Sequence, residues 1–168
     1  MKSFIRDMSK KVMDCKDITY QEALKLINIP LENTEAIELL QHEADKIKNK
    51  FMGNKVDLCS IINVKSGKCS ENCKFCAQSG HHATGIDEYD FLDYDTIGAH
   101  AREMENAGVH RFSLVSSGRG LSKKDTANVL KIYQQLHKDT KIKLCASHGI
   151  ITYEQALALK NAGVFRYH

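Results

Sequence analysis

The sequence predicts an α/β fold, the first half of a (β/α)8 TIM-type barrel with an N-terminal helical extension. Strand-like and helix-like segments alternate along residues 55–168, which is typical of parallel strands joined by helical crossovers. The segments before residue 55 show only helical spacing of apolar residues. The chain has 168 residues, whereas a closed barrel of this type needs about 250, so we expect half a barrel.

Two helices are predicted in the N-terminal extension. Thr19 and Glu22 have the spacing of a capping box, which satisfies free backbone N–H groups at the start of a helix. A longer helix is expected over 34–52, where apolar residues recur three and four positions apart. Asn33 can cap its start, and Gly53 can end it.

Three complete βα units and the start of a fourth follow the extension. Strands are predicted at 56–64, 110–116, 141–146 and from Val164, and helices at 96–107, from Ser122 and from a capping box at Thr152 and Gln155. We therefore divide the chain into a helical extension, residues 1–54, and a partial barrel of about three and a half units, residues 55–168. The end of the chain after a strand, without a closing helix, favours a truncated barrel over a small open sheet that is complete as it stands.

Composition and charge narrow the function classes. The formal net charge is +3, and the lysines are scattered without interleaved aromatic residues, which argues against a nucleic-acid partner. No apolar run is long enough to span a membrane, and the N-terminus lacks the apolar core of a signal peptide. We therefore expect a cytoplasmic protein, in which the six cysteines are more typical of metal binding than of disulfides.

Three of these cysteines form a triplet, Cys69-x3-Cys73-x2-Cys76, in the loop after the first predicted strand. Thiolates at this density suit a soft metal centre. A structural zinc site would require a fourth ligand at matching spacing, and the adjacent His81 and His82 are more typical of a loop surface. The spacing therefore favours an iron–sulfur cubane with three protein ligands and one iron open to a small molecule.

This triplet, placed after the first strand of a βα barrel, resembles the radical S-adenosylmethionine (SAM) superfamily. The resemblance implies a 4Fe–4S cluster whose open iron is chelated by SAM, and a 5′-deoxyadenosyl radical that removes hydrogen from an unactivated C–H bond. It implies that Phe75 lies near the adenine, although a core position for this side chain is the alternative. It also implies that Ser116, Ser117 and Gly118, after the second strand, lie near the methionine moiety.

The residues around the triplet resemble the biotin synthase family within that superfamily. The resemblance implies an enzyme, a sulfurtransferase that inserts sulfur into dethiobiotin to form biotin. It further implies an electron donor such as flavodoxin or ferredoxin and a homodimer. The matching segments cover about residues 56–168 and are Cys59–Asn63, Ser66–Ser79, Thr84–Gly85, Arg111–Val115, Ser117–Arg119, Cys145–Gly149 and Ala162–His168.

The same resemblance implies an auxiliary 2Fe–2S cluster with cysteines from the second and third strands. Cys145 stands at the third-strand position, but Ser113 stands at the second-strand position. A serine hydroxyl is a harder and much more weakly acidic ligand than a thiol, so it is a poor ligand for iron. We therefore hypothesise a variant auxiliary cluster with a different ligand set, while Cys145 as a plain buried thiol is the alternative. Cys15 and Cys59 are expected to be structural.

Three alternatives stay open at this point. Arg111 and Arg119 either orient polar groups near the clusters or form surface salt bridges. The reaction could be that of another radical SAM lyase, mutase or maturase. The chain could also be an inactive truncated fragment, because the later strands of a barrel would carry part of the active site.

Overall fold

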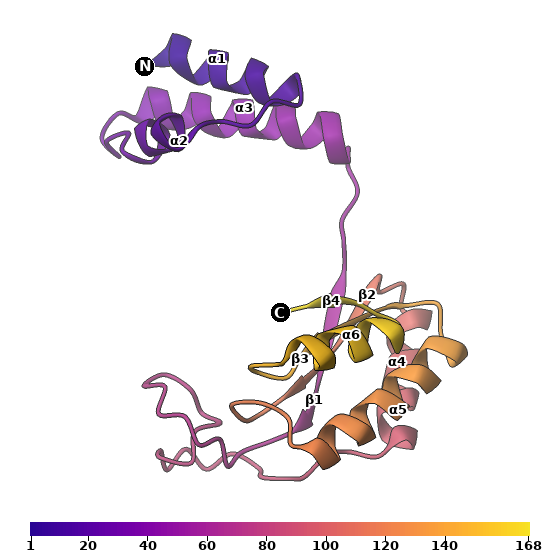
Figure 1. Ribbon diagram of the computed structural model, residues 1–168. Coiled ribbons are helices and arrows are strands. Elements are labelled where there is room, and N and C mark those ends of the chain that lie inside the picture. The colour runs from indigo at the N-terminus through magenta and orange to yellow at the C-terminus, as the bar shows by residue number, and fades with distance from the viewer. The chain divides into compact units, whose positions relative to one another are not determined.

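The computed structural model describes residues 1–168, which form two compact units, Met1–Val56 and Asp57–His168. The first unit is helical, and the second contains a sheet with helices, as Figure 1 shows. None of the six helices combines the length and the apolar character that a membrane crossing requires.

The first unit contains α1 (Lys2–Met13), α2 (Tyr20–Ile27) and α3 (Thr34–Met52). The two predicted helices are confirmed: the Thr19–Glu22 capping box opens α2, and Asn33 caps α3 by accepting a hydrogen bond from Ala36 N–H. The helix α1 was not among those predicted from the sequence. This helix is amphipathic and buries Ile5, which packs in a small apolar cluster with Ile29 and Ala36.

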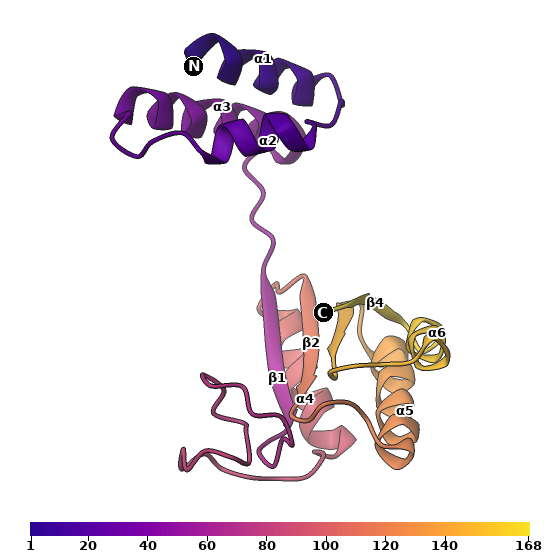
Figure 2. The same cartoon turned by 60° about the vertical axis from the view of Figure 1, so that its left-hand side comes forward.

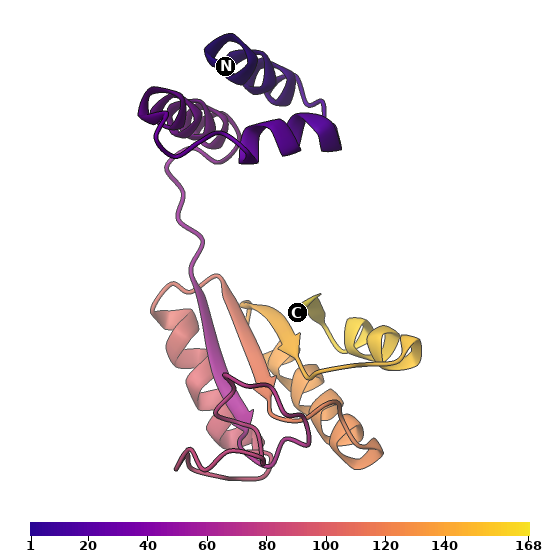
Figure 3. The ribbon, with the colours of Figure 1, turned by 90° about the vertical axis from the view of Figure 1, so that its left-hand side faces the viewer.

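Four parallel strands pair in chain order in the second unit: β1 (Cys59–Lys65), β2 (Arg111–Ser116), β3 (Lys143–Ser147) and β4 (Val164–Tyr167). The connections contain α4 (Tyr94–Asn106), α5 (Lys123–Asp139) and α6 (Tyr153–Asn161). Figures 2 and 3 show the parallel strands and the helices that follow them. The first strand begins later than the predicted 56–64 because Val56 and Leu58 are exposed and have no register partner, although Leu58 C=O accepts from Arg111 N–H.

The two faces of this sheet differ in chemistry because successive strand side chains point to opposite faces. Phe112 and Leu114 of β2 and Leu144 and Ala146 of β3 are fully buried in the core that α4, α5 and α6 cover. The alternate positions place Arg111, Ser113, Lys143 and Cys145 on the other face. In a closed barrel this second face lines the interior.

Candidate functional site

The cysteine triplet lies in a loop that folds back on itself between β1 and α4. We call residues 66–89 the cysteine loop, because Ser66 and Tyr89 close it with two backbone hydrogen bonds of 3.0 and 3.2 Å. Inside it, Cys69 N–H donates to Gln78 C=O at 3.0 Å, and Gly80 N–H donates to Cys69 C=O at 2.9 Å. The loop therefore has its own backbone pairing, with the triplet between the paired segments.

The three thiols of the triplet fit an iron–sulfur cubane as a donor set. All three cysteines are free; Cys73 is exposed, and Cys69 and Cys76 are partly exposed. Cys76 N–H donates to Cys73 C=O at 3.0 Å, which forms a turn between the last two cysteines of the triplet. No group of three His, Cys, Asp or Glu residues is placed to hold a single metal ion. Soft thiolates from one accessible loop suit the larger frame of a cluster.

Side chains brace the cysteine loop against itself. The Gln78 Oε1 atom accepts hydrogen bonds from Gly67 N–H at 2.5 Å and from the Ser66 hydroxyl at 3.2 Å. The Ser79 hydroxyl donates to Glu71 C=O at 2.7 Å, and the Thr84 hydroxyl donates to Ala77 C=O at 2.8 Å. These bonds connect the two halves of the loop.

The two adjacent histidines of the loop take part in this bracing. His81 Nε2 lies 3.1 Å from Ser70 C=O, and His82 Nε2 lies 3.2 Å from Cys73 C=O. Since a carbonyl oxygen only accepts, both ring nitrogens donate. The sequence indicated only a loop-surface position for this pair, and adjacency to the triplet was the one signal for a further role.

Phe75 is 95% exposed, so the alternative of a core position is wrong. The ring lies one residue before Cys76 on the accessible side of the loop. Covering this exposed apolar ring with a ligand would lower the free energy, because apolar surface would be removed from water. Its assignment to the adenine of SAM remains a proposal.

The end of β2 lies against the cysteine loop. Ser117 N–H donates to Lys65 C=O at 2.9 Å, and its hydroxyl donates to Gly67 C=O at 2.7 Å. Gly118 follows with φ +113°, a left-handed conformation that side chains rarely adopt. The structure thus brings Ser117 and Gly118 to the loop that carries the triplet, while their contact with SAM remains a proposal.

Ser113 and Cys145 face each other as register partners on β2 and β3, and both are buried. The Ser113 hydroxyl has no hydrogen-bond partner. Burial is the main cause that raises the pKa of the Cys145 thiol; nearby Cys59 raises it further, whereas Arg111 and Arg166 lower it. This side of the sheet therefore gathers two thiols, an unpaired hydroxyl and two guanidinium groups.

The two arginines left open by the sequence both form ion pairs. Arg111 lies 2.8 Å from Asp57, and Arg119 lies 3.8 Å from Glu71, which sits between the first two cysteines of the triplet. Arg119 is largely exposed, so its pair is screened by solvent. Its position still joins the β2–α5 connection to the cysteine loop.

His148 is a buried polar residue that sequence reasoning did not single out. It follows β3 and is 0% exposed. Its Nδ1 lies 2.9 Å from the Ser116 hydroxyl, its Nε2 lies 3.0 Å from the Tyr133 hydroxyl, and its backbone N–H donates to the Tyr167 hydroxyl at 3.0 Å. Burial lowers the pKa of His148 to about 4, so the ring is neutral near pH 7.

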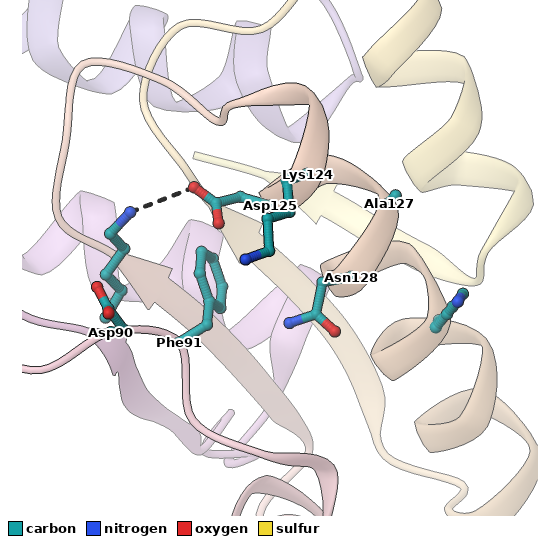
Figure 4. A pocket seen from close by; sticks show the side chains of 8 residues that line it. Asp90, Phe91, Lys124, Asp125, Ala127 and Asn128 are labelled. Atoms are coloured by element: carbon teal, nitrogen blue, oxygen red, sulfur yellow. Dashed lines mark hydrogen bonds and ion pairs between the residues drawn. The ribbon is translucent and has the colours of Figure 1, made fainter.

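A charged cavity lies next to this buried cluster, since its lining residue Phe91 has its ring centre 6.4 Å from that of His148. It encloses about 580 Å³ between the segment before α4 and the first turns of α5, as Figure 4 shows. Its lining is charged and includes Asp90, Lys124 and an ion pair of 3.2 Å between Lys65 and Asp125. No residue of the cysteine loop lines it, although Lys65 and Asp90 directly flank that loop.

Comparison with solved structures confirms the fold. The chain matches methylornithine synthase (PylB) with a TM-score of 0.78 and 20% identity, over 95% of this chain and 46% of that one. It matches HydG, a maturase of the FeFe-hydrogenase, with a TM-score of 0.80 and 19% identity, over 99% of this chain and 36% of that one. The predicted fold class, the first part of a TIM-type barrel, is therefore confirmed.

Curated relatives and a family model give the closer comparison. The chain is 53% identical over 168 residues to biotin synthase of Clostridioides difficile (strain 630), covering 100% of this chain and 52% of that protein. It is 51% identical over 165 residues to biotin synthase of Acetivibrio thermocellus, covering 98% of this chain and 50% of that protein. The chain thus spans about half the length of the curated relatives it matches. The model of the radical SAM superfamily matches residues 63–168, so this chain belongs to that superfamily.

Proposed function

We propose that this chain supplies the cluster-bearing part of a biotin synthase, which converts dethiobiotin to biotin by radical sulfur insertion. The observation that carries the proposal is the 53% identity to the Clostridioides difficile biotin synthase over all 168 residues. That stretch includes the cysteine loop and the strands that carry Ser113 and Cys145. Radical SAM lyases, mutases and maturases are the competing enzyme class, and an inactive fragment is the competing non-enzyme.

Membership of the radical SAM superfamily implies a 4Fe–4S cluster and SAM. In this proposal Cys69, Cys73 and Cys76 hold the cluster, because they are free thiols in one braced loop. The cluster, when bound, supplies the electron that cleaves SAM. The contribution of the loop is to present three ligands and leave the fourth iron open.

The remaining site residues would hold the two ends of SAM. Phe75 is proposed to cover the adenine, since its exposed ring projects from the loop beside Cys76. Ser116, Ser117 and Gly118 are proposed to lie against the methionine moiety. Support for this comes from Ser117, which hydrogen-bonds Gly67 two residues before the first cluster ligand.

An auxiliary iron–sulfur cluster is proposed on the face of the sheet that carries Cys145. The family resemblance implies a 2Fe–2S type with a thiolate at position 113, but Ser113 is a poor ligand for iron. Cys59, which the sequence analysis treated as structural, is a second free thiol near Cys145. We therefore propose a variant ligand set that includes Cys145 and excludes Ser113. Cys59 is a further candidate ligand.

The substrate and partners follow from the same proposal. Dethiobiotin is the proposed substrate, and a small redox protein such as flavodoxin or ferredoxin is the proposed electron donor. A homodimer is proposed from the family resemblance. A cytoplasmic location is proposed as well, because a reducing compartment keeps cluster thiols unoxidised. No role for nucleic acid or a membrane is proposed.

Product analysis of the full-length protein tests the function. The anaerobically reconstituted protein is incubated with dethiobiotin, SAM and a reductant, and biotin and methionine are measured by mass spectrometry. The proposal predicts both products, and neither from the Cys69→Ala variant. Methionine without biotin would favour another radical SAM reaction, and neither product would favour an inactive chain.

A further inference from the structure

A chain of three hydrogen bonds runs from the end of β2 into the core. The Ser116 hydroxyl lies 2.9 Å from His148 Nδ1, and His148 Nε2 lies 3.0 Å from the Tyr133 hydroxyl of α5. The Tyr133 hydroxyl lies 3.1 Å from the backbone carbonyl of Cys145 on β3. We call these four groups the His148 relay. His148 and Tyr133 are fully buried, whereas Ser116 is partly exposed.

The chemistry of the four groups fixes the direction of every proton in the relay. For all three contacts to be hydrogen bonds, the single hydroxyl proton of Tyr133 must go to Cys145 C=O, because a backbone carbonyl only accepts. Tyr133 oxygen must then accept from His148 Nε2–H. A neutral imidazole with a proton on Nε2 has a lone pair on Nδ1. The Ser116 hydroxyl must therefore donate to Nδ1.

This direction determines what Ser116 offers to a ligand. Its only proton is used inside the protein, so the remaining lone pairs of this partly exposed residue can only accept, and a ligand must offer them a donor. No other partner satisfies the Ser116 hydroxyl. Ser116 stands beside Lys65, its register partner at the end of β1, where the cysteine loop begins.

We propose that His148 is a positioning residue: it holds the Ser116 hydroxyl as a fixed hydrogen-bond acceptor for the N–H group of a ligand at the cysteine loop. The N–H group is the amino group of the methionine moiety of SAM, so the inference rests on the proposed function. The relay also ties this acceptor to the strand that carries Cys145. Because the hydroxyl is already oriented, less conformational entropy is lost when the ligand binds.

Two substitutions of His148 separate this role from simple packing. In the His148→Asn variant, the side-chain oxygen replaces Nδ1 and still accepts from Ser116. In the His148→Gln variant, the side-chain nitrogen replaces Nε2 and still donates to Tyr133, while Ser116 loses its acceptor. The dissociation constant for SAM is measured by calorimetry on the reconstituted full-length protein, and the melting temperature is recorded alongside.

We expect His148→Gln to weaken SAM binding about fivefold, the magnitude of one net hydrogen bond, and His148→Asn to retain wild-type affinity. Equal affinities for the two variants would overturn the role of His148, whether both match the wild type or both fall together with the melting temperature.

A variant at the exposed end of the relay avoids disturbing the core. Ser116→Ala should weaken SAM binding about as much as His148→Gln, and the double variant should show no further loss, because both changes remove the same acceptor. Unchanged affinity in Ser116→Ala would overturn the inference even if both His148 variants failed to fold. Failure of the wild-type protein to bind SAM would overturn the proposed function together with the inference.

Discussion

Ser113 and Cys145 are direct register partners on β2 and β3, and the buried hydroxyl of Ser113 has no hydrogen-bond partner. A buried hydroxyl without a partner costs free energy, because it has lost its water and gained nothing in return. The position next to Cys145 thus combines a stability cost with a ligand type that iron disfavours.

The Ser113→Ala substitution is expected to raise the free energy of unfolding of the cluster-free full-length protein by about 1 kcal/mol, since it removes the unpaired hydroxyl. Chemical denaturation monitored by circular dichroism measures the change. Ser79→Ala is the matched control, because the Ser79 hydroxyl donates to Glu71 C=O and accepts from His81 N–H. The control should lose stability. A loss of similar size in Ser113→Ala would show that its hydroxyl has a partner.

Replacement of Cys69 by alanine is expected to abolish the 4Fe–4S cluster, because two remaining thiolates cannot hold a cubane that needs three. Iron and sulfide analysis after anaerobic reconstitution measures the loss. Cys15→Ala is the control, since Cys15 is an exposed free cysteine outside the cysteine loop. Equal cluster content in the two variants would show that Cys69 is not a ligand of the cluster.

Gly149 is expected to tolerate no side chain. Its φ is +75°, and an added Cβ would overlap the Arg119 carbonyl oxygen, so the β2–α5 and β3–α6 connections would have to separate. Gly85 is the control: its φ is +65°, but nothing lies within 4 Å of an added Cβ. Gly85→Ala should cost about 1 kcal/mol of stability from backbone conformation alone, and Gly149→Ala clearly more. Equal costs in thermal denaturation would contradict the close approach of the two connections.

The stability of the protein is expected to fall in acid because of His148. Burial holds its pKa at about 4 in the folded state, below the value of 6.5 for an exposed histidine. The unfolded chain therefore takes up a proton as the pH falls below 6.5, whereas the folded chain resists until about pH 4. The contribution is present above pH 6.5 and is lost between these values, by about 3 kcal/mol in total. Urea denaturation at several pH values should show this loss in the wild type and a smaller one in His148→Phe.

The alternation of elements and most helix starts could be predicted from the sequence because their causes are local. The Thr19–Glu22 capping box opens α2 as expected, and Asn33 caps α3. The same local reasoning placed the first strand from Val56, but the structure begins β1 at Cys59. Strand pairing decides that boundary, since Cys59 is the first residue with a register partner, Arg111.

Site residues could be predicted only where their spacing or the family resemblance identified them. Cys69, Cys73 and Cys76 form a visible motif. His148 lies within the matching segment Cys145–Gly149 but had no role assigned to it, and its partners Ser116 and Tyr133 lie 32 and 15 positions away in different elements. A relay of this kind depends on how β2, β3 and α5 pack, so a single sequence gives no local signal for it.

The most direct test of the central claim is the EPR spectrum of the reduced, reconstituted full-length protein with and without SAM. Three cysteine ligands leave one iron of the cluster open, and a ligand bound there changes the electronic environment of the cluster. We expect a reduced 4Fe–4S signal whose shape changes when SAM is added. A signal that stays the same at saturating SAM would contradict the assignment of Cys69, Cys73 and Cys76 as the three ligands of a SAM-binding cluster.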